Sequence, residues 1–220
     1  MTPRPRTVSD EHILMAAQRA MARLGPTRLT LAEVAREAGL SPATLVQRFG
    51  SKRGMMLALW TGAVDGVDAC FDMLKAAHTS PLDAVIEGAT MLARGTKSAE
   101  ELANHLAFLQ IDVSDPEFRE HMLLMSRRTE DGYRRLLDDA VAENELIPCD
   151  TMRLARAVVS ISGGSLIGWA VFREGTAEAW VKADLETLLA PYRSRTAPGA
   201  RPSRMAGGRR PASRRRGLPS

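Results

Sequence analysis

The sequence predicts an all-α protein. Apolar residues recur three and four positions apart over most of the chain, which is the spacing of one helix face. Ser, Thr or Asp stands just before several of these stretches, often with Pro next or Glu three residues on, as at helix N-termini. No stretch shows the convincing alternation of apolar and polar residues that predicts a strand.

The first predicted helix begins after Ser9 or Asp10 and ends at Gly25. Its inward stripe consists of Ile13, Ala17, Ala20 and Leu24. We expect this helix to pack under the two short helices that follow, so that the three form one small bundle.

Residues 30–53, TLAEVAREAGLSPATLVQRFGSKR, predict two short helices joined by a tight turn and followed by the start of a third. Thr30 and Glu33 match a capping box, which satisfies free N–H groups at a helix start. Gly39 follows the first short helix, where the turn needs a left-handed backbone that Gly adopts with little strain. Ser41 then caps the second helix. This arrangement is a helix-turn-helix.

With Leu45 facing the core, the second short helix presents Ala43 and Gln47 outward and Thr44 at its flank. A helix-turn-helix inserts this part of the helix into the major groove of DNA. Gln47 has the amide geometry for a bidentate pair with adenine, and Thr44 suits a methyl or phosphate contact. Lys52 lies at the start of the third helix, where its charge and the helix dipole favour a phosphate.

The segment LAEVAREAGLSPATLVQRFGSKRGM resembles the DNA-binding signature of the tetracycline-repressor (TetR) family of bacterial transcription regulators. The resemblance implies a homodimer that binds a palindromic operator and releases it when a small ligand enters the C-terminal domain. The residues that it brings to bases or phosphates are Thr30, Pro42, Ala43, Thr44, Gln47 and Lys52. The sequence differs from the family pattern at one position, where it has Val46 and the family usually has a phosphate-binding Tyr. Phosphate contacts are therefore expected to depend more on Arg48, on Lys52 or on the termini.

Further helices are predicted by their start and stop signals. They span about 51–77, 81–95, 98–112, 115–144 and 150–173, with a last helix from Thr176. The first of these is the expected mechanical connection between the two parts of the molecule. The leucines expected to face inward include Leu92, Leu102, Leu106 and Leu109.

Residues 157–172, AVVSISGGSLIGWAVF, carry no charge. The stretch is shorter than the roughly twenty apolar residues of a membrane span, so we expect a helix buried on all sides. Small residues recur every four positions in it and let another helix approach closely. The residues expected at a four-helix interface between two subunits are Ser160, Gly164, Gly168, Val181, Leu185 and Leu188. The TetR resemblance implies the same location, and a core helix of a monomer is the alternative.

Charge divides the chain into three regions, with net charges of +5 over residues 1–60, −10 over 61–192 and +9 over 193–220. The N-terminal region is therefore the natural partner of a polyanion. The expected organisation is a flexible arm (1–8), a helix-turn-helix DNA-binding domain (9–56), a helical effector-binding and dimerisation domain (57–193) and a disordered Arg-rich tail (194–220). The arm and the tail either add contacts to DNA or are solvated extensions.

Nothing in the sequence predicts catalysis. The four histidines have no metal-ligand spacing, and no phosphate-binding glycine loop or nucleophile motif is present. Cys70 and Cys149 lie far apart and suit two reduced thiols better than a disulfide. An enzyme, a metal site and a cofactor are therefore not expected. The polar N-terminus contains no secretory signal, which indicates a cytoplasmic protein away from the membrane.

A ligand cavity is expected among the C-terminal helices. Its candidate lining residues are His105, Phe108, Leu109, His121, Met125 and Trp169, and core packing is the alternative role for each. The expected effector is an apolar or aromatic small molecule. It would favour a form whose two recognition helices no longer match half-sites separated by about 34–36 Å.

These observations predict a sequence-specific transcriptional regulator that binds double-stranded DNA as a homodimer, acting as a ligand-released repressor. One alternative is a DNA-associated architectural protein without an effector, which would discriminate little between sequences. Another is a small-molecule binding or catalytic helical protein whose helix-turn-helix is vestigial, and Val46 in place of the Tyr is its only support.

Overall fold

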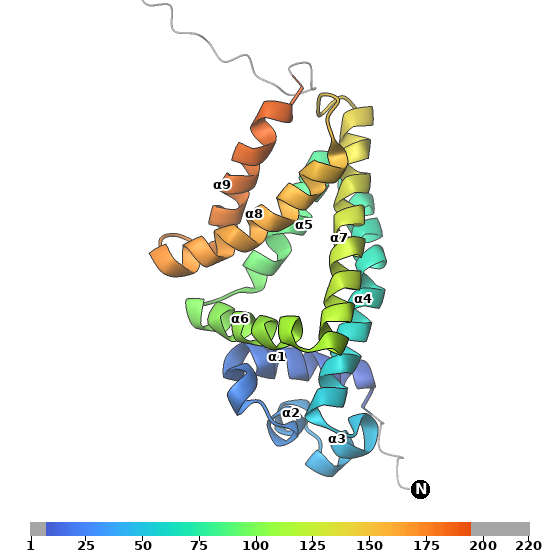
Figure 1. Ribbon diagram of the computed structural model, residues 1–220, viewed down its shortest axis with the longest axis vertical. Coiled ribbons are helices and arrows are strands. Elements are labelled where there is room, and N and C mark those ends of the chain that lie inside the picture. The colour runs from blue at the N-terminus through green and yellow to red at the C-terminus, as the bar shows by residue number, and fades with distance from the viewer. Residues whose placement is uncertain (1–7, 195–220) are drawn as a thin grey trace, which may run out of the picture.

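The computed structural model describes residues 8–194, and over this range the chain is all-helical, as the sequence predicts (Figure 1). The helices are α1 (Asp10–Arg28), α2 (Leu31–Ala38), α3 (Pro42–Phe49), α4 (Lys52–Ala77), α5 (Pro81–Gly95), α6 (Ala99–Ser114), α7 (Pro116–Ala142), α8 (Thr151–Phe172) and α9 (Ala177–Leu189). Helices α1, α2 and α3 lie at one end of the molecule, and α4 runs from that end alongside α7 toward α5, α8 and α9.

Helix starts follow the capping pattern of the sequence. Thr30 accepts a hydrogen bond from the Glu33 N–H, and Ser98 accepts one from the Glu101 N–H. Gly39 ends α2 with φ of 68°, the left-handed conformation expected for the turn. Because each cap satisfies N–H groups that would otherwise be unpaired, these short polar side chains fix where the helices begin.

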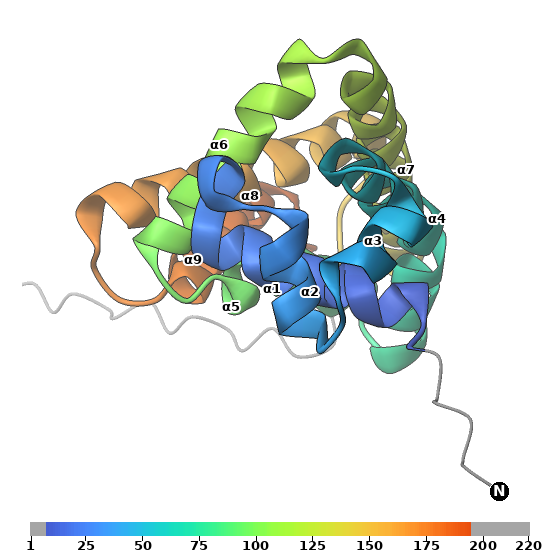
Figure 2. The ribbon, with the colours of Figure 1, turned by 90° about the horizontal axis from the view of Figure 1, so that it is seen from below.

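The N-terminal helices, which Figure 2 shows from below, pack around their own hydrophobic cluster. Ile13, Val34, Leu45 and Met55 are fully buried there and come from α1, α2, α3 and α4. Two aromatic residues from farther along the chain complete the cluster, and these are Phe108 of α6 and Phe118 of α7, which are 4% and 3% exposed. The core beneath the helix-turn-helix is therefore shared with the C-terminal helices.

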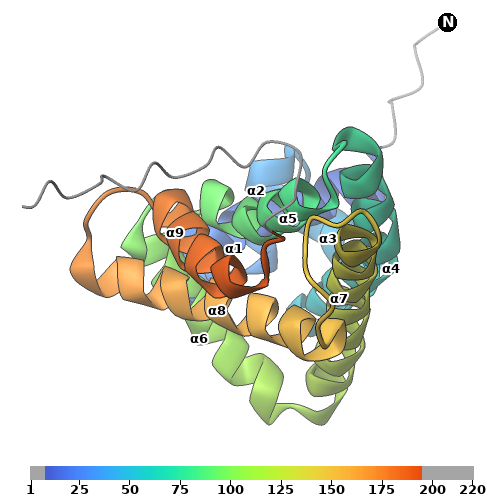
Figure 3. The ribbon, with the colours of Figure 1, turned by 90° about the horizontal axis from the view of Figure 1, so that it is seen from above.

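The second cluster joins α4, α5, α7, α8 and α9, whose arrangement is seen from above in Figure 3. Val85, Leu137, Val158 and Leu185 are fully buried in it. Phe71 meets Tyr133 edge-on, with ring centroids 4.9 Å apart and planes at 86°, which is a favoured aromatic geometry. This cluster holds the two long helices α4 and α7 side by side.

Helix α6 lies across α1 and connects the two clusters. The Asn104 side-chain amide donates a hydrogen bond to the Ala22 carbonyl over 2.7 Å. Next to this contact, Gly25 breaks α1 with φ of 66°, and a Cβ atom there would lie 2.5 Å from Asn104 Oδ1. A side chain at position 25 would therefore be strained in its backbone and would also displace the Asn104 side chain.

Three predicted inward leucines are exposed, namely Leu92 (59%), Leu106 (37%) and Leu109 (41%). On α6 the buried residues are Leu102, Phe108 and Asp112, so the contact with α1 selects a face rotated from the one predicted. Two overlapping apolar stripes on one helix cannot be separated by spacing alone.

The prediction that the uncharged helix is buried on all sides is also wrong for the single chain. In α8, Ile167 is 47% exposed, Val171 72% and Phe172 64%, while Val158 and Leu166 face the core. The helix is long and apolar enough to cross a membrane by length and composition, but only 28% of its most apolar window is buried. One face of α8 packs on α7 and α9, and the opposite face is uncovered.

The predicted N-terminal arm and Arg-rich tail lie outside the described residues, apart from Val8 and Ser194.

Replacing Phe118 with Ala should destabilise the protein by about 3–5 kcal/mol, because a large buried ring is lost from the N-terminal cluster. Urea unfolding of the variant measures this loss. Leu124→Ala on the same helix is the matched control, since Leu124 is 44% exposed and should cost no more than about 0.5 kcal/mol. Equal losses in the two variants would contradict a shared core.

Candidate nucleic-acid interface and ligand cavity

The exposed surface of α3 presents the residues that the sequence predicts at DNA bases. Leu45 is fully buried and fixes the rotation of the helix. Pro42, Ala43 and Gln47 are exposed, and Thr44 is half-buried at their flank. The first turns of α3 thus carry small side chains and one amide on an open surface, which suits insertion into a major groove.

The predicted phosphate-binding residues make contacts within the chain. Arg48 Nη1 donates to the Val8 carbonyl over 2.5 Å and to Asp10 Oδ1 over 2.9 Å. Lys52 Nζ donates to the Pro26 carbonyl over 2.6 Å, and burial lowers the pKa of its ammonium group. Arg48 therefore contacts the start of α1 and Lys52 contacts its end. Both side chains would have to leave these acceptors to reach a phosphate. The sequence could not indicate these contacts, because a backbone carbonyl is present at every position.

The hydroxyl groups on this surface act as caps. Thr30 Oγ1 accepts from the Glu33 N–H, and Thr44 Oγ1 lies 2.9 Å from Ser41 Oγ. Val46 is 51% exposed, so the position where the family usually has a Tyr does face solvent. An apolar side chain there offers no hydrogen bond to a phosphate.

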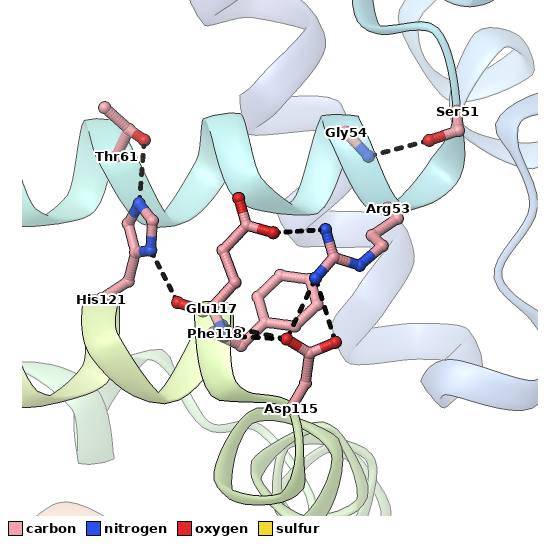
Figure 4. A network of polar contacts seen from close by, with 8 residues as sticks. All are labelled: Ser51, Arg53, Gly54, Thr61, Asp115, Glu117, Phe118 and His121. Carbon is pink, nitrogen blue, oxygen red and sulfur yellow. Dashed lines mark hydrogen bonds and ion pairs between the residues drawn. The ribbon is translucent and has the colours of Figure 1, made fainter.

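Arg53, in the first turn of α4, joins the helix-turn-helix to the start of α7 (Figure 4). Its guanidinium group donates to Glu117 Oε2 over 2.6 Å and to both Asp115 oxygens over 3.0 Å. The same group lies 5.1 Å from the centroid of the Phe118 ring, within cation–π range. These contacts raise the pKa of Arg53 and lower that of Asp115. We call Arg53, Asp115, Glu117 and Phe118 the Arg53 cluster.

One turn farther along, His121 adds a contact between α7 and α4. Its Nδ1 lies 2.9 Å from the Glu117 carbonyl oxygen, and its Nε2 lies 3.4 Å from Thr61 Oγ1 (Figure 4). The predicted ligand residue His121 is thus part of a helix–helix contact.

An apolar cavity with a volume of about 530 Å³ lies between α4, α5, α7 and α8. Phe71, Met91 and Val159 contribute apolar surface from three of these helices. The polar groups of the wall are those of Cys70, Thr129 and Tyr133. Burial raises the pKa of the Tyr133 phenol, so this group is neutral and available as a hydrogen-bond donor. We call this space the main cavity.

The structure does not bring the six predicted ligand residues together. Met125 lines the main cavity, whereas Phe108 belongs to the N-terminal cluster and Leu109 is exposed. His105 is half-buried on α6, and the Trp169 indole donates to the Gly175 carbonyl beyond the end of α8. The prediction failed because it placed α6 beside the cavity, whereas α6 packs across α1 instead.

The predicted interface residues also separate into two groups. Ser160 and Gly164 are exposed on α8, but Val181 and Leu185 of α9 are fully buried in the core of their own chain. Leu188 is half-buried, and a Cβ atom at Gly168 would meet the Trp180 ring at 3.2 Å. Val181 and Leu185 are therefore covered within their own chain, where α9 packs against α5 and α8, and they have no surface left for a second subunit.

Among residues 8–194, no group of three or more His, Cys, Asp or Glu side chains is placed to hold a metal ion. Cys70 and Cys149 are free and half-buried. Taken together, residues 8–194 combine an exposed helix that suits a major groove, a core shared between the N-terminal and C-terminal helices, and an apolar cavity.

Comparison with known proteins shows what the N-terminal segment and the fold resemble. Residues 13–59 match the model of the bacterial regulatory proteins of the tetR family. The structure resembles that of the TetR family transcriptional regulator PfmR from Thermus thermophilus, with 24% identity, 84% of this chain and 97% of that chain covered, and a TM-score of 0.54. A comparison with curated proteins found no significant match.

Two structures with lower sequence identity also share the fold. A TetR transcription regulator from Haloarcula marismortui has 15% identity, with 84% of this chain and 98% of that chain covered and a TM-score of 0.68. FadR from Bacillus subtilis, solved in complex with stearoyl-CoA, has 13% identity, coverages of 83% and 98%, and a TM-score of 0.58. Residues 13–59 therefore resemble the DNA-binding domain of tetR-family regulators, and residues 8–194 share the fold of solved structures of such regulators.

Gln47→Ala should weaken binding to the cognate DNA site by about 1–3 kcal/mol and relax the preference at one base position, because the bidentate amide contact is lost. Titration of duplexes that carry each base at that position measures both effects. Gln110→Ala, at an exposed position of α6, is the matched control and should leave affinity unchanged. A uniform loss at all base positions would show that Gln47 does not read sequence.

Proposed function

We propose that the protein is a homodimeric repressor that binds a palindromic operator and is released from it by a small, uncharged, largely apolar molecule. Such a bacterial regulator would act in the cytoplasm, where the DNA is. The observation that carries the ligand response is that one helix, α7, contributes both to the wall of the main cavity and to the Arg53 cluster.

The open face of α8 supports the homodimer. Ile167 and Val171 are 47% and 72% exposed, and Gly163 and Gly164 lie exposed beside them. No atom of the described residues lies within 4 Å of a Cβ atom built at either glycine. A backbone without side chains, flanked by exposed apolar residues, suits the close approach of a second helix. A twofold axis at this face would pair α8 with its copy.

The chemistry of the main cavity supports an uncharged ligand. Its described lining residues include neither a basic nor an acidic side chain, and the Tyr133 phenol is held neutral by burial. A charged group would lose its hydration there without a partner, which costs several kcal/mol. B. subtilis FadR was solved with stearoyl-CoA, but the phosphates of a CoA group would find no basic partner among these lining residues.

The connection from cavity to DNA runs along α7. Met125, Thr129 and Tyr133 line the cavity from successive turns of this helix, and Phe118 and Glu117 in its first turn hold Arg53. Arg53 lies three residues after Gly50, which ends the recognition helix. A ligand that shifts or rotates α7 would therefore move the start of α4 and with it α3, provided that it binds the two states unequally.

Selection from a random pool of DNA duplexes at near-physiological salt should enrich a palindrome. The variant Ile167→Glu should remain folded but monomeric in light scattering, because its charge would be desolvated at the α8 contact. Its affinity for the selected palindrome should fall by about a hundredfold or more, since the two half-sites are no longer bound by one linked unit.

Leu124→Glu on α7 is the control for an added charge at an exposed apolar position, and it should stay dimeric. An enriched sequence without twofold symmetry, or an Ile167→Glu protein that remains dimeric, would contradict the proposed assembly. Binding without any enrichment would favour the architectural alternative.

Arg53→Met should broaden the distribution of distances between the two recognition helices. Spin labels at Gln47→Cys, in a chain with Cys70→Ser and Cys149→Ser, report this distance by pulsed electron paramagnetic resonance. We expect the distribution of the otherwise unchanged chain to include about 34–36 Å, the separation of half-sites one turn apart. Removing the guanidinium group breaks the contacts of Arg53 with Asp115 and Glu117 and should therefore broaden the distribution of distances between the two labels.

Arg135→Met is the matched control, because Arg135 also pairs with an acidic residue across α4 and α7 but lies far from α3. A distribution that is identical in Arg53→Met and Arg135→Met would show that the Arg53 cluster does not set the helix separation.

A further inference from the structure

A second, smaller cavity lies where the helix-turn-helix meets the C-terminal helices. Its volume is about 210 Å³, and its wall comes from α1, α4, α6 and α7. An engineered cavity of about 150 Å³ is large enough to bind benzene, so this space can hold a molecule with a single ring. We call it the junction cavity.

One acidic side chain stands out in the wall of the junction cavity. Asp112 is 5% exposed, and its Oδ1 is buried without a hydrogen-bond partner among the described residues. Loss of hydration raises the pKa of this carboxyl group, an interaction with the Trp60 side chain opposes the rise, and the like charge of Asp115 adds to it. Buried carboxylate oxygens are almost always paired, so an unpaired one beside an open space indicates a missing partner.

The surroundings favour a cation as that partner. Asp112 lies in the last turns of α6, where the free carbonyl groups carry the negative end of the helix dipole. Trp60 lines the same cavity, and an indole ring is the best aromatic surface for a cation. Met21 and Met56 add polarizable apolar surface that suits the rest of an organic molecule.

We propose that the junction cavity binds a small organic ammonium ion, with its charged group on Asp112 and its apolar part against Trp60, Met21 and Met56. The site is distinct in chemistry from the main cavity, which offers no charged side chain among its described lining residues. The two spaces share Ala63 and Met125, so they are neighbours. This proposal does not depend on the ligand response proposed above.

Occupancy of this site would act on the orientation of the DNA-binding helices. Gln18 and Met21 come from α1, whereas Asp112 and Met125 come from α6 and α7. A bound cation would therefore contact side chains that pack against each hydrophobic cluster, Met21 on the N-terminal one and Met125 on the second.

The test uses benzylammonium and its neutral analogue benzyl alcohol as probes of the full-length protein. Isothermal titration calorimetry at neutral pH should show that benzylammonium binds and that benzyl alcohol binds more weakly. Asp112→Asn keeps the shape of the side chain and should weaken benzylammonium binding at least about tenfold, because a charge-assisted hydrogen bond is lost. The affinity for benzyl alcohol should change little.

Two control variants separate the junction cavity from the protein's overall charge and from the main cavity. Asp72→Asn removes the same charge from an exposed position of α4 and should leave the preference for the cation intact. Tyr133→Phe alters the main cavity alone and should also leave it intact. Equal binding of the two probes, or an unchanged preference in Asp112→Asn, would overturn the proposal. Loss of the preference in Tyr133→Phe would assign the cation to the main cavity and overturn it as well. Circular dichroism of each variant checks that the helices are retained.

Discussion

The burial of Phe118 beneath Arg53 is the contact on which the rest of the structure depends. The ring completes the N-terminal cluster, although it belongs to α7, and the guanidinium group above it pairs with Asp115 and Glu117 at the start of that helix. The middle of α7 then lines the main cavity. Packed side chains adopt discrete arrangements and do not deform continuously. Helix α7 is fixed at both places, and it is the helix through which we propose that the cavity acts on the DNA-binding surface.

The all-α fold and its helix starts were predictable, because both follow from local chemistry. A Ser, Thr or Asp that caps the N–H groups three residues on acts within one turn, and Gly39 needs no partner elsewhere to end α2. The rotation of α3 was also predictable from Leu45 alone. The face of α6 was not, because Leu102, Leu106 and Leu109 form a stripe as regular as the one that is buried. Only the contact with α1 decides between the two faces.

In the candidate site, too, features set by local chemistry were predictable and features set by tertiary contacts were not. Gln47 and Ala43 are exposed on α3 as helical geometry requires, whereas Arg48 and Lys52 bind backbone carbonyls from distant segments that no spacing rule reveals. The Arg53 cluster was missed for the same reason, since Glu117 lies about sixty residues from Arg53 along the chain. Asp112 was missed because its burial depends on how α6 packs on other helices. Val181 and Leu185 formed a correct apolar stripe, but the stripe faces the chain's own core.

The shared aromatic core has a consequence for engineering. The matched family segment, residues 13–59, would be the obvious piece to transfer to another protein as a DNA-binding unit. Cut out alone, it would lose Phe108 and Phe118 and leave two ring-sized gaps in the N-terminal cluster. Each lost ring costs about 3–5 kcal/mol, against a total stability of about 5–15 kcal/mol for a whole domain. A portable version would therefore have to carry α6 and the first turn of α7, or receive new apolar residues that fill both gaps.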